Sequence, residues 1–215
     1  MKKIFSALFL AVVLTTGLVA ETKMLSVNFT VPFDIHTQKL SGYGETEKYT
    51  EKLTSIGFGL SGVNMFSEVV GLYMDVSLGF FQSLKFETPY GNISLKRSDM
   101  AEDAKQFSMD MRIGPAFKII DNDKMFLSAA PVLFFNFGYS GTSDSATSTS
   151  GGFVGLGANA SFSYFFNSVV GLSAGLDIGY GFVGFGDYKK LSDSGITSKH
   201  SQFNITPKIG VAFKF

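Results

Sequence analysis

The sequence predicts an all-β protein, an eight-stranded antiparallel transmembrane up-and-down β-barrel, from three observations. The 215-residue chain is 45% hydrophobic and only 17% charged, yet after its first 20 residues no apolar run reaches the ~18–20 residues that a spanning helix requires. Apolar residues instead alternate with small or polar ones at the two-residue period of a strand. Short connections also alternate with long polar ones, which is typical of membrane barrels.

The composition excludes several classes of protein. The chain has no cysteine, so it has no disulfide framework, no thiolate zinc site and no catalytic cysteine. Its 18 basic and 18 acidic residues balance, whereas proteins that bind nucleic acids usually carry a basic excess. We expect a non-enzymatic protein with no catalytic, cofactor-binding or metal site and no nucleic-acid partner.

The first 20 residues have the pattern of a secretory signal peptide. Lys2 and Lys3 precede a mostly apolar segment, Ile4–Leu14, and Ala20 supplies a small residue for cleavage. The segment is short for the alternative, an N-terminal membrane anchor. We expect cleavage near Ala20, which leaves residues 21–215 as one transmembrane barrel domain.

Strand alternation is clearest in Val69–Phe81. One face is apolar from Val70 to Phe80, and the other is mostly small or polar and includes Asp75 and Ser77. A membrane barrel turns the apolar face to lipid and the polar face to its lumen, whereas a soluble sandwich would bury the apolar face. The other predicted strands are Leu25–Phe33, Ile56–Ser61, Phe107–Gly114, Leu127–Gly138, Val154–Tyr164, Val170–Phe182 and Gln202–Phe215.

Four prolines fall inside or at the ends of these strands, namely Pro32, Pro115, Pro131 and Pro207. A proline cannot donate to the ladder, and a closed barrel has no edge strand to hold it. We therefore expect these prolines near strand ends or bulges.

The connections predict the sidedness of the barrel. Short ones lie near Gly62–Glu68, Ile120–Lys124 and Phe165–Ser168, and the pattern Phe-x-x-Val-Val-Gly-Leu occurs at both Phe66–Leu72 and Phe166–Leu172. An even number of strands places both chain ends on the short-turn side, which is periplasmic in such barrels. The long connections are residues 34–53, 82–105, 140–151 and 187–200.

Two long connections are candidate contacts for an extracellular partner, loops 34–53 and 82–105. In the second, two alternating stretches flank Thr88–Gly91, which has turn chemistry and predicts a protruding hairpin. The alternative is a solvated loop without a partner. The two histidines, His36 and His200, fall in separate predicted loops without a local cluster of ligands.

Charged residues are predicted inside the lumen, at Asp75, Asp110, Arg112, Asp177 and Lys208. An eight-stranded barrel is just wide enough for side chains to fill it, and an unpaired charge there costs several kcal/mol. We expect Arg112 or Lys208 within ion-pair reach of an aspartate, and a mostly plugged polar lumen. The alternative is a narrow aqueous or ligand path, because the many small residues leave room.

The last eight residues contain Lys208, Gly210, Phe213 and Phe215 at a characteristic spacing. This segment resembles the terminal signature of bacterial outer-membrane β-barrels, which runs polar, any, glycine, two any, aromatic, any, aromatic. In strand number and length the chain resembles the small eight-stranded class, the OmpX, OmpW and OmpA-barrel type. The resemblance implies a location in the outer membrane, contact with its lipid, and recognition of this segment by the barrel-assembly machinery.

We expect an outer-membrane surface protein with extracellular loops for interaction. A small pore or carrier for small apolar molecules is the alternative. A third possibility is a lipid A-modifying enzyme, for which Asp34 and His36 offer candidate side chains but no matching motif.

Overall fold

The computed structural model describes residues 22–42, 45–100, 105–141, 148–187, 192–193 and 196–215. The predicted signal peptide, residues 1–20, lies outside the described residues. In the part of the chain that is described, no helix is long and apolar enough to cross a membrane.

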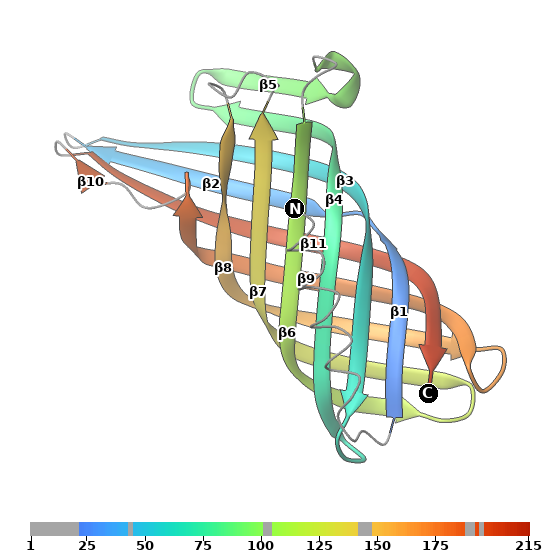
Figure 1. Cartoon of the computed structure of the whole chain (residues 1–215). Helices are drawn as coiled ribbons and strands as arrows, with labels where there is room; N and C mark the ends of the chain where they lie inside the picture. The colour runs from blue at the N-terminus through green and yellow to red at the C-terminus, as the bar shows by residue number, and fades with distance from the viewer. Residues whose placement is uncertain (1–21, 43–44, 101–104, 142–147, 188–191, 194–195) are drawn as a thin grey trace.

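Antiparallel strands close into a barrel of eight members, as the sequence predicts (Figure 1). β1 and β2 are two halves of the first member, because both pair with β3 on one side and with β11 on the other. The ring consists of β1 (Thr22–Thr30), β2 (Phe33–Gly42), β3 (Glu45–Met65), β4 (Val70–Thr88), β6 (Lys105–Asp121), β7 (Met125–Gly141), β8 (Thr149–Phe165), β9 (Val170–Gly186) and β11 (Ile196–Lys214). Outside the ring lie β5 (Gly91–Lys96), β10 (Ser192–Asp193) and the 3₁₀ turn η1 (Arg97–Asp99).

The barrel closes between its first and last strands, as predicted. In the β1–β11 ladder Leu25 lies opposite Phe213 and Thr30 lies opposite Lys208. Backbone groups without partners cost several kcal/mol each in hydrocarbon, so a spanning sheet must close on itself. The pairing therefore joins segments that nearly the whole described chain separates.

The predicted faces of the strands are confirmed. In β4, Asp75 and Ser77 are each 2% exposed, whereas Phe80 on the opposite face is 50% exposed. Leu78 shares the outward face with Phe80 because side chains alternate along a strand. The outer surface of the barrel is thus apolar and its lumen is lined by small and polar side chains, which is the arrangement of a transmembrane barrel.

The wall strands are longer than the sequence predicts. β3 has 21 residues and β6 to β9 have 17 each, whereas a tilted strand crosses a membrane with ~9–11. The prediction of a loop at residues 34–53 is wrong, because β2 and β3 pair there from Phe33–Thr54 to Gly42–Glu45. A ladder needs only backbone donors and acceptors, so a loss of hydrophobicity marks the edge of the apolar belt and not the end of a strand. We call the end with the short connections the turn end and the opposite one the extended end.

The repeated sequence pattern marks two equivalent turns at the turn end. Ser67 Oγ accepts a hydrogen bond from the amide of Val70 at 3.0 Å. Asn167 Oδ1 accepts the corresponding bond from Val170 at 2.8 Å. The phenylalanine that begins each turn is exposed, as suits the aromatic girdle at a membrane interface.

The prolines lie where the ladders are irregular, as expected. Pro32 separates β1 from β2, and the neighbouring Val31 donates its amide to the carbonyl of Pro207 at 3.1 Å. Pro115 and Pro131 both fall in the stretch where the β6–β7 ladder lacks paired residues. At each of these positions the missing N–H donor of proline therefore disturbs few regular ladder hydrogen bonds.

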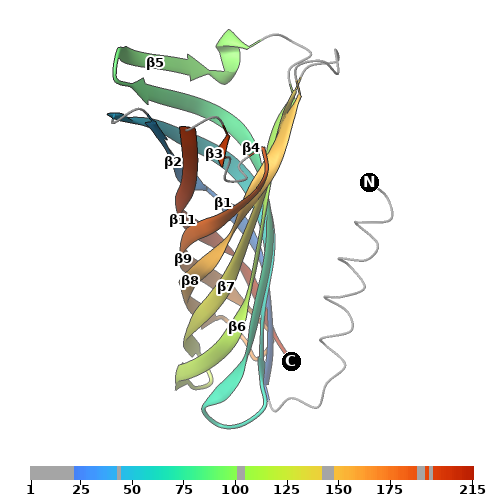
Figure 2. The same ribbon diagram turned by 90° about the vertical axis from the view of Figure 1, so that its left-hand side faces the viewer.

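The hairpin predicted within residues 82–105 is present. β5 pairs with the end of β4 from Thr88–Gly91 to Ser83–Lys96. Gly91, in the turn, has a φ of 148°, which favours glycine. In both views the hairpin reaches beyond the ends of the other strands and bends sideways (Figures 1 and 2).

The wall divides toward the extended end. The β9–β11 ladder ends at Gly181–Gln202, although β9 continues along β8 and β11 continues along β2. The β4–β6 ladder ends at Phe80–Phe107, while β4 continues along β3. Among the described residues, the barrel therefore ends in two groups of strands, one made of β2, β3, β4 and β11 and the other of β6 to β9.

Candidate functional site: the lumen

Charged side chains from four strands meet inside the barrel. Asp75 on β4, Asp110 and Arg112 on β6, Asp177 on β9 and Lys208 on β11 are each at most 6% exposed. Asp75 lies directly opposite Arg112 in the β4–β6 ladder, and the curvature of the closed wall brings the other three across the lumen. We call these five residues the charge layer.

Arg112 is completely enclosed and touches three carboxylates. Its Nη1 lies 3.3 Å from Asp75 Oδ1 and 3.4 Å from Asp177 Oδ2. Its Nη2 lies 3.4 Å from Asp110 Oδ2, and the guanidinium carbon is 5.2 Å from the centre of the Phe134 ring. Several partners together offset the cost of removing a guanidinium from water, which a single ion pair often does not.

Lys208 links the last strand to β4 and β9. Its Nζ lies 2.8 Å from Asp75 Oδ2 and 2.6 Å from Asp177 Oδ2. It also donates a hydrogen bond to the Tyr73 hydroxyl at 2.8 Å, and that hydroxyl donates to Asp177 Oδ1 at 3.3 Å. The ion pairs expected from the sequence are therefore formed, and two cations share two of the carboxylates.

Three asparagines complete this network. Asn136 Nδ2 donates to Asp110 Oδ1 at 2.6 Å, and Asn159 Nδ2 donates to Asp177 Oδ1 at 2.7 Å. Asn204 Oδ1 accepts a bond from the Arg112 guanidinium at 2.5 Å. These amides were not predicted as members of the charge network. The signal that could have found them is their inward position in the alternation, which they share with the charged residues.

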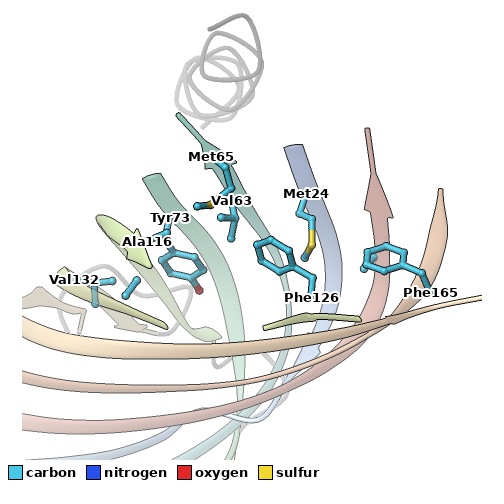
Figure 3. Packing of buried hydrophobic residues seen from close by; sticks show 10 residues of the cluster. Met24, Val63, Met65, Tyr73, Ala116, Phe126, Val132 and Phe165 are labelled. Carbon is cyan, nitrogen blue, oxygen red and sulfur yellow. The ribbon is translucent and has the colours of Figure 1, made fainter. Parts of the chain in front are cut away.

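Apolar side chains close the lumen at the turn end (Figure 3). Met65 and Phe126 are completely buried, and Phe165 is 2% exposed. These residues lie in or next to the short turns that the sequence predicts, so the cluster was not predicted. Extending the predicted strands by a few residues would have revealed it. This apolar plug consists of Met24, Val63, Met65, Tyr73, Ala116, Phe126, Ala130, Val132, Phe165 and Ala212.

Two small cavities lie on opposite sides of the charge layer and share no lining residue. The cavity toward the turn end measures about 10 Å³ and is lined in part by Asn28 and Lys208. The cavity toward the extended end measures about 60 Å³ and is lined in part by Asp34, His36 and Asn136. A single water molecule needs ~10–15 Å³, so the charge layer separates two spaces of a few water molecules at most.

The two histidines meet at the extended end. His36 Nε2 lies 3.2 Å from His200 Nδ1, and the rings stack. His36 Nδ1 lies 3.4 Å from Glu51 Oε2, and His200 Nε2 lies 2.8 Å from Ser198 Oγ. The expectation of separate loops is wrong because β2 and β11 continue there as paired strands, with Gln202 opposite His36. Within the described ranges, no group of three or more His, Cys, Asp or Glu side chains is placed to hold a metal ion.

The residues of the C-terminal signature occupy different environments. Lys208 belongs to the charge layer, and a Cβ at Gly210 would lie 2.0 Å from the Val27 carbonyl oxygen, so β1 and β11 approach closely there. The expectation that Phe215 is the last residue of the closing strand is wrong, since β11 ends at Lys214. The ladders on both sides of β11 stop before Phe215, and its side chain is 70% exposed.

Comparison with known proteins supports the fold. No protein-family model matches the sequence, and no curated protein matches it. Among solved structures, the outer membrane protein OprG from Pseudomonas aeruginosa is similar over 91% of this chain and 96% of its own, with a TM-score of 0.61 and 12% identity. Ail, the attachment invasion locus protein of Yersinia pestis, covers 89% of this chain and 98% of its own, with a TM-score of 0.45 and 12% identity.

The similarity to OprG and the closed, apolar-surfaced barrel define the class of the molecule. The chain has the fold of the small outer-membrane β-barrels, as an eight-stranded antiparallel transmembrane barrel. In this fold the short turns face the periplasm and the longer connections face outward.

Proposed function

We propose that the protein is a non-enzymatic outer-membrane surface protein with a closed lumen, whose extended end faces the exterior and carries its function. The double closure of the lumen is the observation that carries this proposal. In the charge layer, Arg112 and Lys208 are at most 6% exposed. The apolar plug fills the turn end of the lumen. Side chains fill an interior of this size readily, so the accessible chemistry lies at the extended end.

Conductance in planar bilayers tests the closure. We expect no steady ion conductance from the unmodified protein. Replacing Arg112→Ala together with Phe126→Ala removes one large side chain from each barrier and is expected to open a measurable channel. The matched control replaces two exposed residues, Lys199→Ala and Phe166→Ala, and should stay closed. Steady conductance of the unmodified barrel at the level of the opened variant would overturn the proposal.

The projecting hairpin is the surface that we propose for contact with an extracellular partner. Tyr90 is 84% exposed and Ile93 is 57% exposed, and a cluster of exposed apolar side chains on a surface is typical of an interaction site. Among the described strands β5 pairs with β4 alone, so no described strand covers its other edge. Residues 34–53, which the sequence predicts as a loop, offer little separate surface to a partner, because β2 and β3 form barrel wall there.

A photo-crosslinker at position 90 on intact cells tests this surface. We expect a crosslinker at position 90 to form adducts with an extracellular partner. A crosslinker at position 58 should form no such adducts, because Phe58 is 65% exposed on the lipid-facing wall. Adducts that form equally from both positions, or from neither, would contradict a partner site on the hairpin.

One observation favours the second candidate function, a carrier for small apolar molecules. Where the β9–β11 ladder stops, a groove of about 220 Å³ on the outer wall is lined in part by Tyr180, Phe182 and His200. His200 also lines a space of about 210 Å³ at the mouth of the barrel. Since His200 borders both spaces, it is the point at which an apolar molecule from the membrane would pass sideways to the mouth without crossing the charge layer.

A switchable crosslink separates this function from the first. Gly181 and Gln202 form the last pair of the β9–β11 ladder, so a Phe182→Cys and Ser201→Cys pair, one step beyond it, is designed to join the two strands across the division when oxidised. A carrier is expected to move an apolar fluorescent dye into vesicles. In the double-cysteine variant this transport should be slower when the cysteines are oxidised and should return to the full rate after reduction. Dye entry no faster than into empty vesicles would exclude the carrier function.

A further inference from the structure

Two residues that line the cavity at the extended end each have a buried oxygen without a partner among the described residues. Asp34 and Gln202 line it and are 4% and 5% exposed. Asp34 Oδ1 accepts hydrogen bonds from Gln202 Nε2 at 2.7 Å and from Asn204 Nδ2 at 2.8 Å. Within the described part of the chain, Asp34 Oδ2 and Gln202 Oε1 have no hydrogen-bond partner. Leaving a buried acceptor unsatisfied is costly, and more so when it is charged, so these two oxygens indicate a missing donor.

The lumen also has fewer positive than negative charges. The two buried cations are both engaged by the three aspartates of the charge layer, and among the described residues no ion pair includes Asp34. A buried carboxylate needs a partner of opposite charge or a proton, and the described residues give Asp34 no direct ion-pair partner. The buried charged side chains of the lumen are Asp34, Asp75, Asp110, Asp177, Arg112 and Lys208.

Four phenylalanine and tyrosine rings form part of the remaining wall of this cavity. Phe81 and Phe153 are at most 3% exposed, and Phe107 and Tyr139 also line the space. Aromatic faces attract cations, and their apolar surface accommodates a short carbon chain. The cavity thus combines two acceptors, an unbalanced negative charge and an apolar wall. A matching ligand would be small and positively charged, with N–H donors and an apolar body.

We propose that this cavity binds a small primary ammonium cation. Its N–H groups donate to Asp34 Oδ2 and Gln202 Oε1, and its carbon chain lies among the aromatic rings. The ligand enters from the extended end, because Tyr139 and Ser150 near the ends of β7 and β8 line the same space. Water is the competing occupant, since it would supply hydrogen bonds but no charge.

Calorimetric titration with n-butylammonium tests the proposal on the whole barrel in phosphatidylcholine nanodiscs. We expect saturable binding, weakened at least about tenfold by Asp34→Asn, because a hydrogen bond to a charged group is lost. Gln202→Met, which removes the second acceptor, is a further variant expected to weaken binding. Glu87→Gln is the matched control, since this carboxylate lies on the projecting hairpin outside the cavity. A folded state for each variant is verified by circular dichroism before titration.

Two related probes separate charge from hydrogen bonding. Tetramethylammonium carries the charge without N–H groups, and n-butanol has the carbon chain without the charge; both are expected to bind at least about tenfold more weakly than n-butylammonium. Equal affinities for n-butylammonium and n-butanol, equal affinities of the unmodified protein and Asp34→Asn, or no saturable binding would each overturn the proposal and leave water as the occupant.

The ammonium group could come from a free amine or from an ethanolamine lipid headgroup. Repeating the titration in nanodiscs that contain phosphatidylethanolamine distinguishes these sources. A headgroup that occupies the cavity would lower the apparent affinity for n-butylammonium by competition. An unchanged affinity would assign the site to free amines.

Discussion

Lys208 and Asp75 form an ion pair at 2.8 Å inside the barrel, although 133 positions separate them along the chain. Lys208 lies on the closing strand and Asp75 on β4, so the pair crosses the lumen and ties together strands that do not share a ladder. Because the closed wall alone brings them together, the pair depends on correct closure and also stabilises it.

Breaking the charge layer should strongly destabilise the barrel. Lys208→Met leaves Asp75 and Asp177 with fewer compensating partners, and we expect a loss of ~3–5 kcal/mol in the free energy of unfolding. Reversible urea unfolding in lipid vesicles measures it. Lys199→Met, an exposed change on the same strand, should cost little. In the double variant with Asp75→Asn the two losses should not add, and strict additivity would show that the pair does not interact.

The lipid-facing register predicts opposite behaviour of two neighbouring residues. Leu78→Arg places a charge on the outer face, and we expect a cost of ~2–4 kcal/mol near the middle of the membrane. A cysteine at position 78 should react with a lipid-soluble thiol reagent, while one at position 77 should be protected because Ser77 is 2% exposed and faces the lumen. The reverse labelling pattern would shift the register of β4 by one residue.

The projecting hairpin should remain ion-paired in acid. Hydrogen bonds from Lys52 and Lys85, each 2.8 Å from Glu87 Oε1, lower the pKa of Glu87 from 4.5 to about 2. Because the folded pKa lies below the unfolded one, the interaction stabilises the hairpin fully above pH 4.5. This contribution decreases as the pH falls and is absent below about 2.

Carbon-detected NMR of the Glu87 carboxylate measures this titration directly. Replacing Lys52→Met and Lys85→Met together should raise its midpoint toward 4.5. A midpoint near 4.5 in the unmodified protein would show that the two lysines do not hold the carboxylate in solution.

Changing Phe215 should affect assembly of the barrel in cells without affecting the stability of the folded barrel. Phe215 lies beyond both ladders and is 70% exposed, so Phe215→Ala should change the free energy of unfolding of refolded barrels in urea by no more than ~0.5 kcal/mol. We expect the same change to lower the folded yield in cells, which immunoblotting of unheated samples measures. Equal folded yields of the Phe215→Ala variant and the unmodified protein in cells would show that Phe215 has no role in assembly.

Gly210 supplies the contrasting case. A Cβ at Gly210 would lie 2.0 Å from the Val27 carbonyl oxygen, whereas one at Gly138 would have no neighbour nearer than 3.9 Å. Gly210→Ala should therefore reduce stability even in barrels refolded from urea, while Gly138→Ala should not. Equal stability of the two variants would contradict the close approach of β1 and β11.

The sequence by itself determined which face of each predicted strand meets lipid and which charges within those strands enter the lumen. Leu78 and Asp75 could be assigned because alternation is a property of a single strand, and it holds wherever that strand pairs. Closure also followed from the sequence, since an open edge is not tolerated in hydrocarbon.

Only the tertiary structure decided how far the strands extend and which distant residues meet. The expected loop at residues 34–53 is paired wall, because backbone pairing continues where the apolar pattern stops. The contact between His36 and His200, and the unpartnered oxygen of Asp34 beside Gln202, depend on the register of the β2–β11 ladder. That register is set by long-range pairing between the two ends of the chain, to which no local pattern of residues is sensitive.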